Sequence, residues 1–181
     1  TSIEIPSGVT SIGNSAFSGC RNIDTINVAS NNSVYKSDGN CLIEISTNTL
    51  IVGCKNSIIP NYVTSIGDSA FSGCSSLTSI EIPSGVTSIG NYAFSGCSSL
   101  ANIVIPDSVT SIGRSAFYNC NSLESIYYTG TAEEWSSIIF NSGNDPLTSA
   151  TVYYLSNQLT DEQKADGNNY WHYVDGVPTI W

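Results

Sequence analysis

The fold is decided by the stretch Thr78–Cys97, whose sequence is TSIEIPSGVTSIGNYAFSGC. The chain opens with almost the same stretch, Thr1–Cys20, in which Ser15 occupies the place of Tyr92. The repeat phenylalanine returns every 23 residues in three units, at Phe71, Phe94 and Phe117. A fixed period of this length is typical of supersecondary units that stack on one another, and not of a single globular core.

Each unit contains the pattern of a short strand. In the copy that begins at Leu77, Ile80 and Ile82 are two residues apart, so both point to one side of a strand. Ser79 and Glu81 therefore point to the other side, outward. Further buried positions are predicted after the strand, at Val86, Ile89, Ala93, Phe94 and Cys97.

Stacking of these units predicts the fold. Adjacent copies place Ile80 beside Ile103 and Phe94 beside Phe117, while Gly90 permits a tight turn within its unit. One unit cannot close a core alone, and at least three are needed. We therefore predict a repeat solenoid with one short parallel β-strand per rung of about 23 residues, joined by turns and short helical segments and closed by a C-terminal cap.

The unit L-x-x-I-x-I-P…V-T-S-I-G…A-F-x-x-C resembles the BspA-type leucine-rich repeats of bacterial surface proteins. The Ile-Gly, Ala-Phe and Cys positions recur together at fixed offsets, which makes the motif specific. Four stretches carry it: Ile3–Cys20, Ile58–Cys74, Leu77–Cys97 and Leu100–Cys120. The resemblance extends over most of the chain and implies a leucine-rich-repeat-like horseshoe or rod. For some members it also implies adhesion to host proteins.

The unit at residues 23–53 is irregular. The repeat phenylalanines on either side of it are 54 residues apart, which is 23 plus 31, so it carries about eight extra residues and lacks the Ala-Phe segment. The stretches Cys41–Ile45 and Leu50–Cys54 predict a β-hairpin with its turn between them. That register places Cys41 opposite Cys54, where a disulfide is possible. We interpret the insertion as structural.

The C-terminal part departs from the repeat as well. Thr131 and Glu134 form a capping box, which predicts a short helix through Trp135 and Ile138, and Leu147–Val152 predicts one last strand. Residues 1–155 then form the solenoid with its C-terminal cap. Residues 156–181 are predicted to be a polar linker followed by an aromatic hairpin tail.

The tail has two local signals of a hairpin. Asp175–Gly176 is typical of a type I′ turn between two strands. Pro178 lacks a backbone N–H and confines the second strand to the edge of a sheet.

Composition argues against several classes of partner. The chain has 181 residues and a net charge of −10, with only five Lys and Arg residues, whereas nucleic acids are bound by clustered basic side chains. No apolar run approaches the ~20 residues that span a bilayer, so no membrane insertion is expected. A surface with 11% charged residues and many hydroxyl and amide groups suits a secreted or cell-surface repeat protein, which we expect to be a monomer. Because the chain opens in mid-repeat at Thr1, we expect it to be a piece of a longer protein.

The six cysteines do not indicate a metal site. No C-x-x-C pair is present, and His172 is far away in sequence. Four cysteines share one repeat position and are predicted to form a ladder of buried thiols: Cys20, Cys74, Cys97 and Cys120. No nucleophile–base pair or phosphate-binding glycine loop is recognisable either, so we predict no enzyme activity and no cofactor.

Two surfaces are candidates for binding. The first is the outward row of strand positions: Ser2, Glu4, Thr25, Asn27, Ser79, Glu81, Asn102, Val104, Ser125 and Tyr127. Among these, Glu4, Asn27, Ser79, Glu81, Asn102 and Tyr127 are the predicted binding residues. The second surface is the tail, where Tyr170, Trp171, Tyr173 and Trp181 form either a stacking platform for sugar rings or a flap that seals the last rung.

These features predict a non-enzymatic binding or adhesion scaffold of a secreted or cell-surface bacterial protein. Its partner would be a host or neighbouring-cell protein or glycoprotein docked on the outward strand face. Two alternatives remain open. One is a carbohydrate-binding module centred on the aromatic tail, and the other is a structural stalk or spacer.

Overall fold

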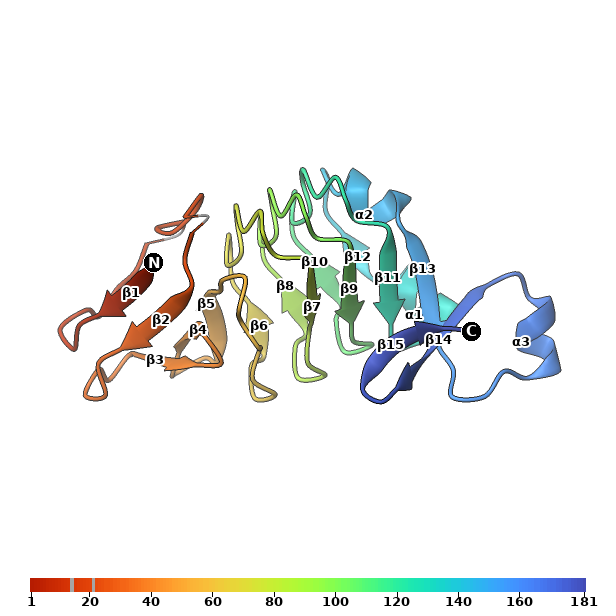
Figure 1. Cartoon of the computed structure of the whole chain (residues 1–181), viewed down its shortest axis with the longest axis horizontal. Helices are drawn as coiled ribbons and strands as arrows, with labels where there is room; N and C mark the ends of the chain where they lie inside the picture. The colour runs from red at the N-terminus through yellow and green to blue at the C-terminus, as the bar shows by residue number, and fades with distance from the viewer. Residues whose placement is uncertain (14, 21) are drawn as a thin grey trace.

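The chain is an elongated stack of rungs, with the N-terminal strands at one end and the C-terminal segment at the other (Figure 1). The structure is a computed structural model that describes residues 1–13, 15–20 and 22–181. The repeat solenoid expected from the sequence is confirmed.

The described residues form three sheets. The first has six strands in the order β15-β14-β13-β11-β9-β7, and we call it the row sheet because it contains the predicted row of repeat strands. Its strands are β7 (Ser79–Glu81), β9 (Asn102–Ile105), β11 (Ser125–Tyr128), β13 (Thr151–Leu155), β14 (Asn169–Val174) and β15 (Val177–Ile180). A two-stranded sheet pairs β1 (Ser2–Ile5) with β2 (Thr25–Val28) at the N-terminal end.

The back sheet is seven-stranded within the described residues, in the order β12-β10-β8-β6-β5-β4-β3. Its strands are β3 (Tyr35–Asp38), β4 (Cys41–Glu44), β5 (Thr49–Val52), β6 (Ser65–Ile66), β8 (Ser88–Ile89), β10 (Ser111–Ile112) and β12 (Ile139–Phe140). Three short helices lie in the C-terminal part of the described chain: α1 (Ala132–Ser137), α2 (Asp145–Ser149) and α3 (Asp161–Ala165).

The predicted row of parallel strands is confirmed. The regular rungs also contain a second, shorter strand, which lies in the back sheet. In the row sheet, Ile80 pairs with Ile103 and Ile103 with Ile126, as the period requires. The two-residue strands β6, β8 and β10 pair in parallel in the back sheet. They arise from the V-T-S-I-G segment, because its isoleucine is buried in these three rungs, at Ile66, Ile89 and Ile112, and the backbone beside it pairs with the same position of the next rung.

The core of the regular rungs is a stack of phenylalanine rings. Phe94 lies between Phe71 and Phe117, with ring centroids 5.0 and 5.1 Å away and nearly parallel planes. All three side chains are fully buried. The 23-residue period therefore places identical side chains in direct contact.

The tight turn expected from the sequence begins at Gly90, where Ala93 N donates to Gly90 O at 3.4 Å, and the glycine also serves close packing between rungs. A Cβ at this position would lie 2.7 Å from backbone atoms of Gly67 and Asp68 in the preceding rung. The left-handed backbone lies two residues later, where Tyr92 has a φ of 56°. Glycine is needed here because the two backbones approach too closely for a side chain.

The irregular unit contains the predicted hairpin, but its register differs. β4 and β5 are antiparallel, and a bulge between Leu42 and Ile43 pairs Leu42 with Val52. Cys41 and Cys54 therefore do not face each other, and both are free. The thiol of Cys41 contacts the carbonyl of Ile58, whereas that of Cys54 contacts the carbonyl of Asp24. The possible Cys41–Cys54 disulfide is not formed in this structure, because the extra residue of the bulge places the two thiols in different parts of the core.

The irregular unit also divides the core into two clusters. One contains Ile5, Ile26 and Leu42, and the other runs through the later rungs. Because the second unit lacks its Ala-Phe segment, the first unit packs directly on the third, with Gly19 N donating to Ser72 O at 3.1 Å. Cys20 is exposed at this end rung and does not extend the buried cysteine ladder as predicted.

The capping helix is confirmed. The hydroxyl of Thr131 accepts from Glu134 N, and the Glu134 carboxylate accepts from Thr131 N. The helix ends at Ser137. Leu147 lies in α2 and not in the predicted last strand, because Asn144 and Pro146 begin a helical turn before β13.

The tail hairpin is confirmed, and the segment before it is not only a linker. α3 begins with a second capping box, in which Thr160 and Gln163 cap each other. β14 then joins the row sheet in parallel with β13, and β15 pairs with β14 in antiparallel orientation. Asp175 and Gly176 have φ values of 50° and 79°, as a type I′ turn requires. β15 is the edge strand of the sheet.

Candidate functional site

The candidate site is a groove on the outward face of the row sheet. Its volume is about 620 Å³, which lies within the range of ligand sites, roughly 300–1,000 Å³. Strands β7 and β9 supply one wall with Ser79, Glu81 and Asn102, and the tail supplies another with Tyr173 and Pro178. The residues 57–61 of the third rung close the far side. The groove therefore unites the two binding surfaces that the sequence suggested separately.

The tail reaches the groove because the β14–β15 hairpin extends beyond the end of β13 and lies across the outward side of the row (Figure 1). The Trp171 ring packs on Tyr127 of β11 at 5.3 Å between centroids, and on Tyr173 at 4.8 Å. Trp171 Nε1 donates to the carbonyl of Tyr128 at 2.9 Å. These contacts fix the hairpin on the row sheet.

One hydrogen bond crosses the groove. The Tyr173 hydroxyl donates to Glu81 Oε1 at 2.9 Å, across 92 residues of sequence. Desolvation, followed by the hydrogen bond to Glu81, raises the pKa of Tyr173 to about 12. The phenol therefore stays protonated at neutral pH and holds one oxygen of the Glu81 carboxylate in place.

The structure separates the predicted site residues into four groups. Ser79, Glu81, Asn102 and Tyr173 line the groove. Tyr127 and Trp171 lie beside it and support its tail wall. Glu4 and Asn27 lie in the separate N-terminal sheet, where Asn27 Nδ2 donates to Glu4 Oε1 at 2.6 Å. Trp181 lies at the chain end and stacks on His172.

Two features of the groove were not expected from the sequence. Ile58 lines it with 77% of its surface exposed. It precedes Ile59-Pro60 as Glu81 precedes Ile82-Pro83, so alignment of the third rung with the fourth would have revealed an outward isoleucine. Val104, predicted to face solvent, is only 4% exposed. It lies at the base of the groove, which Tyr173 and Pro178 of the tail also line.

The tail does not form the continuous aromatic platform that sugar stacking needs. Trp171 is fully buried. Trp181 is 50% exposed, but its ring lies 4.0 Å from that of His172 in a parallel stack, and its Nε1 donates to Ser156 O. These contacts agree with the alternative of a flap on the last rung.

Comparison with protein families identifies the repeat. The model of the BspA type leucine rich repeat region matches residues 1–52 and 51–162, in six copies. The chain belongs to the BspA-type leucine-rich-repeat family of bacterial surface proteins. The comparison with curated proteins found no match.

Several solved structures are similar to this chain, and the first two named here share its architecture. A leucine-rich repeat protein from Eubacterium ventriosum is 28% identical with a TM-score of 0.67, and the match covers 86% of this chain and 42% of that one. The pneumococcal vaccine antigen PcpA is 15% identical with a TM-score of 0.56, covering 91% of this chain and 53% of that one. A leucine rich cell surface protein from Faecalibacterium prausnitzii is 34% identical with a TM-score of 0.40, covering 79% of this chain and 52% of that one. The BspA-type chain thus spans about half the length of these proteins.

The described part of this BspA-type chain contains no group of three or more His, Cys, Asp or Glu side chains placed to hold a metal ion. Among the described residues, no helix is both long enough and apolar enough to cross a bilayer.

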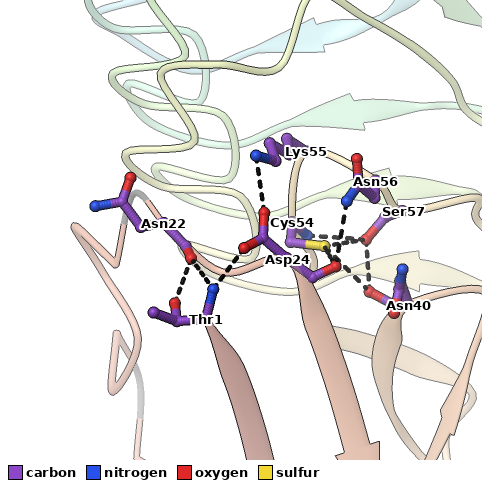
Figure 2. A network of polar contacts seen from close by, with 8 residues as sticks. All are labelled: Thr1, Asn22, Asp24, Asn40, Cys54, Lys55, Asn56 and Ser57. Atoms are coloured by element: carbon purple, nitrogen blue, oxygen red, sulfur yellow. Dashed lines mark hydrogen bonds and ion pairs between the residues drawn. The ribbon is translucent and has the colours of Figure 1, made fainter.

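A polar network joins the irregular second unit of the BspA-type solenoid to residues 54–57, where the third rung begins (Figure 2). Lys55 Nζ lies 2.8 Å from Asp24 Oδ1, and Asn56 Nδ2 donates to the carbonyl of Asp24. Ser57 Oγ donates to the carbonyl of Asn40 at 2.6 Å. Hydrogen bonds from Lys55 and from the amino group of Thr1, together with their charges, lower the pKa of Asp24 to about 2. The groups of the network bond one another, so we assign it a structural role.

The repeat cysteines behave as small core side chains. Cys97 and Cys120 are fully buried, and their thiols donate to the carbonyls of Phe71 and Phe94 at 3.2 and 3.1 Å. Burial raises the pKa of Cys74 and of Cys120 to about 12. Burial also raises the pKa of Cys97. These side chains remain neutral thiols at physiological pH, and the thiolate is the reactive form.

We therefore expect thiol labelling of the native chain to be selective. Cys20 is exposed and should react with a maleimide or disulfide reagent within minutes, whereas Cys74, Cys97 and Cys120 should react only after addition of denaturant. Mass spectrometry of the labelled protein counts the modified sites. In a Cys20→Ser variant, none of the three remaining ladder cysteines should be labelled quickly. Fast labelling of Cys97 in the native state would contradict the buried ladder.

Proposed function

We propose that this BspA-type chain is a non-enzymatic binding or adhesion scaffold of a secreted or cell-surface bacterial protein. Its partner is a host or neighbouring-cell protein or glycoprotein that docks on the outward face of the row sheet. The observation that carries the proposal is the groove of about 620 Å³ between β7, β9 and the tail.

The composition of the groove supports recognition of a partner. It combines polar groups of Ser79, Glu81 and Asn102 with apolar surface from Ile58 and Pro178. Binding sites are mostly apolar with a few placed polar groups that fix orientation, and solenoids commonly bind along the face formed by their strands. Membership of a family of bacterial surface proteins supports the location.

The test is a solid-phase array of host matrix proteins and glycans, probed with the 181-residue chain and two matched variants. Ser79→Arg places a long side chain in the groove. Ser2→Arg adds the same side chain at the same repeat position of the first rung, in the separate sheet. We expect Ser79→Arg to weaken binding at least ~10-fold, because it fills part of the docking surface. Ser2→Arg should bind like the parent chain.

Each outcome of the array decides between the functions. Equal loss in both variants, or no loss in either, would contradict docking at the groove. A chain that binds no protein and no glycan on the array would leave the role of a stalk or spacer. Binding to glycans alone, reduced by Trp181→Ala and unaffected by Ser79→Arg, would favour a carbohydrate-binding module at the tail.

A further inference from the structure

The free edge of β7 lies in the groove. β7 is the last strand of the row sheet and pairs only with β9 among the described strands. Ile82 N donates to Val104 O at 3.0 Å, so this residue and Ile80 direct their backbone groups toward β9. The backbone N–H and C=O groups of Ser79 and Glu81 therefore face the other way, toward the third rung.

The third rung does not satisfy these groups. Its residues 57–59 correspond in the repeat to a row strand but line the opposite side of the groove, and no backbone hydrogen bond of the described residues joins them to β7. The amide of Ile58 is instead drawn to the irregular unit, where it donates to the carbonyl of Gly39 at 2.8 Å. The parallel ladder of the row sheet is thus interrupted beside an exposed strand edge, and unpaired edges are templates for an added strand.

The charge of the groove indicates which kind of partner strand it would bind. Glu81 is the only charged residue that lines it, and none of the described lining residues carries a positive charge. The Tyr173 hydroxyl donates to Oε1 of Glu81, whereas Oε2 takes part in no hydrogen bond or ion pair among the described residues. The net charge of the chain, −10, adds an attraction for a basic partner.

The apolar surface beside Glu81 fits the stem of a basic side chain. Ile58 stands at the corresponding outward position of the third rung and is 77% exposed. Lysine and arginine cover apolar surface with their methylene stems while the charged head stays at a polar group. The ring of Tyr173, held against Glu81, offers a face for the cation.

From this geometry we infer that the groove binds an extended, basic segment of the partner protein by adding it as a strand to the edge of β7. A lysine or arginine of that segment places its head group on Glu81 and Tyr173 and its stem on Ile58. The backbone of the segment pairs with Ser79 and Glu81. This inference rests on the proposed function and names the partner chemistry of the same groove.

The test uses blocked five-residue peptides of the sequence threonine-valine-X-valine-threonine, in which X is lysine, norleucine or glutamate. Binding to the isotope-labelled full chain is followed by NMR titration at low and high salt. We expect the lysine peptide to shift the backbone amides of Ser79 and Glu81 and to bind at least about fivefold more tightly than the norleucine peptide. The glutamate peptide should bind least, and salt should reduce the difference.

Two matched variants separate charge from fold. Glu81→Gln should reduce lysine-peptide affinity about fivefold, to that of norleucine. Glu4→Gln, at the same repeat position of the first rung, should leave it unchanged. Methylation of the backbone nitrogens of the lysine peptide should weaken binding to the parent chain, because it removes the donors of an added strand. Equal affinity for lysine and norleucine, an unaffected Glu81→Gln, or no effect of methylation would overturn the inference.

Failure of this inference can be told apart from failure of the proposed function. If an array partner is lost in Ser79→Arg but is neither displaced by the lysine peptide nor weakened by Glu81→Gln, the groove is a docking site for other chemistry. No peptide binding up to several millimolar, together with an array free of partners, would reject both.

Discussion

Replacement of Phe94 by alanine is expected to lower the free energy of unfolding by about 3–5 kcal/mol. Phe94 is fully buried between two rings at 5.0 and 5.1 Å, so its removal leaves a cavity within the stack and breaks two ring contacts. Phe117→Ala should cost less, because Phe117 stacks on one phenylalanine ring and not on two. Each aromatic pair contributes roughly 0.5–1.5 kcal/mol. Urea unfolding followed by circular dichroism measures both changes.

The matched control for Phe94 is Tyr92→Ser. Tyr92 is exposed on the same turn, and serine occupies its place in the other three phenylalanine-bearing copies, at Ser15, Ser69 and Ser115. This change should leave the urea midpoint almost unaltered. A midpoint that is also unaltered in Phe94→Ala would mean that the rungs do not stack in this register.

Replacement of Trp171 by alanine is expected to release the tail hairpin from the row sheet. Its indole is fully buried, contacts Tyr127 and Tyr173, and donates a hydrogen bond to the carbonyl of Tyr128. Loss of a buried tryptophan costs about 3–5 kcal/mol. We expect the free energy of opening of β14, measured by native-state hydrogen exchange, to fall by this amount while the rungs around Phe94 stay protected.

Trp181→Ala is the control for Trp171→Ala, because it removes a second tryptophan from the same tail. Its side chain is half exposed and makes one hydrogen bond to Ser156, so a clearly smaller loss is expected. Because Tyr173 follows Trp171 on the same strand face, Trp171→Ala should also free Glu81 and weaken the lysine peptide. Unchanged exchange of β14 in Trp171→Ala would show that the tail does not depend on this contact.

Much of the fold could be predicted from residues that repeat. Ile80, Ile103 and Ile126 lie side by side because identical units stack with a constant offset, and local alternation fixes which side is buried. The second strand of each rung was missed, since two residues such as Ser88–Ile89 are too short for a periodic signal. The Cys41–Cys54 register was missed because a bulge depends on packing of the whole hairpin.

The candidate site could be predicted only in part. Alternation identified Ser79, Glu81 and Asn102 as outward, and the tail was recognised as aromatic. Their meeting in one groove was not visible, because nothing in the local sequence specifies where a terminal hairpin folds. Ile58 was missed because an isoleucine beside Ile59 does not alternate with a polar residue, as Glu81 does with Ile82 in the next rung.

The sequence by itself determined the solenoid, the phenylalanine stack, the capping helix and the turn of the tail, because each depends on neighbours within one unit or on exact repetition between units. The tertiary structure alone decided the groove. Trp171 holds the tail across the row, the Tyr173–Glu81 hydrogen bond spans 92 residues, and the third rung leaves the edge of β7 unpaired. Contacts of this kind join segments that share no period, so they depend on how the complete chain packs.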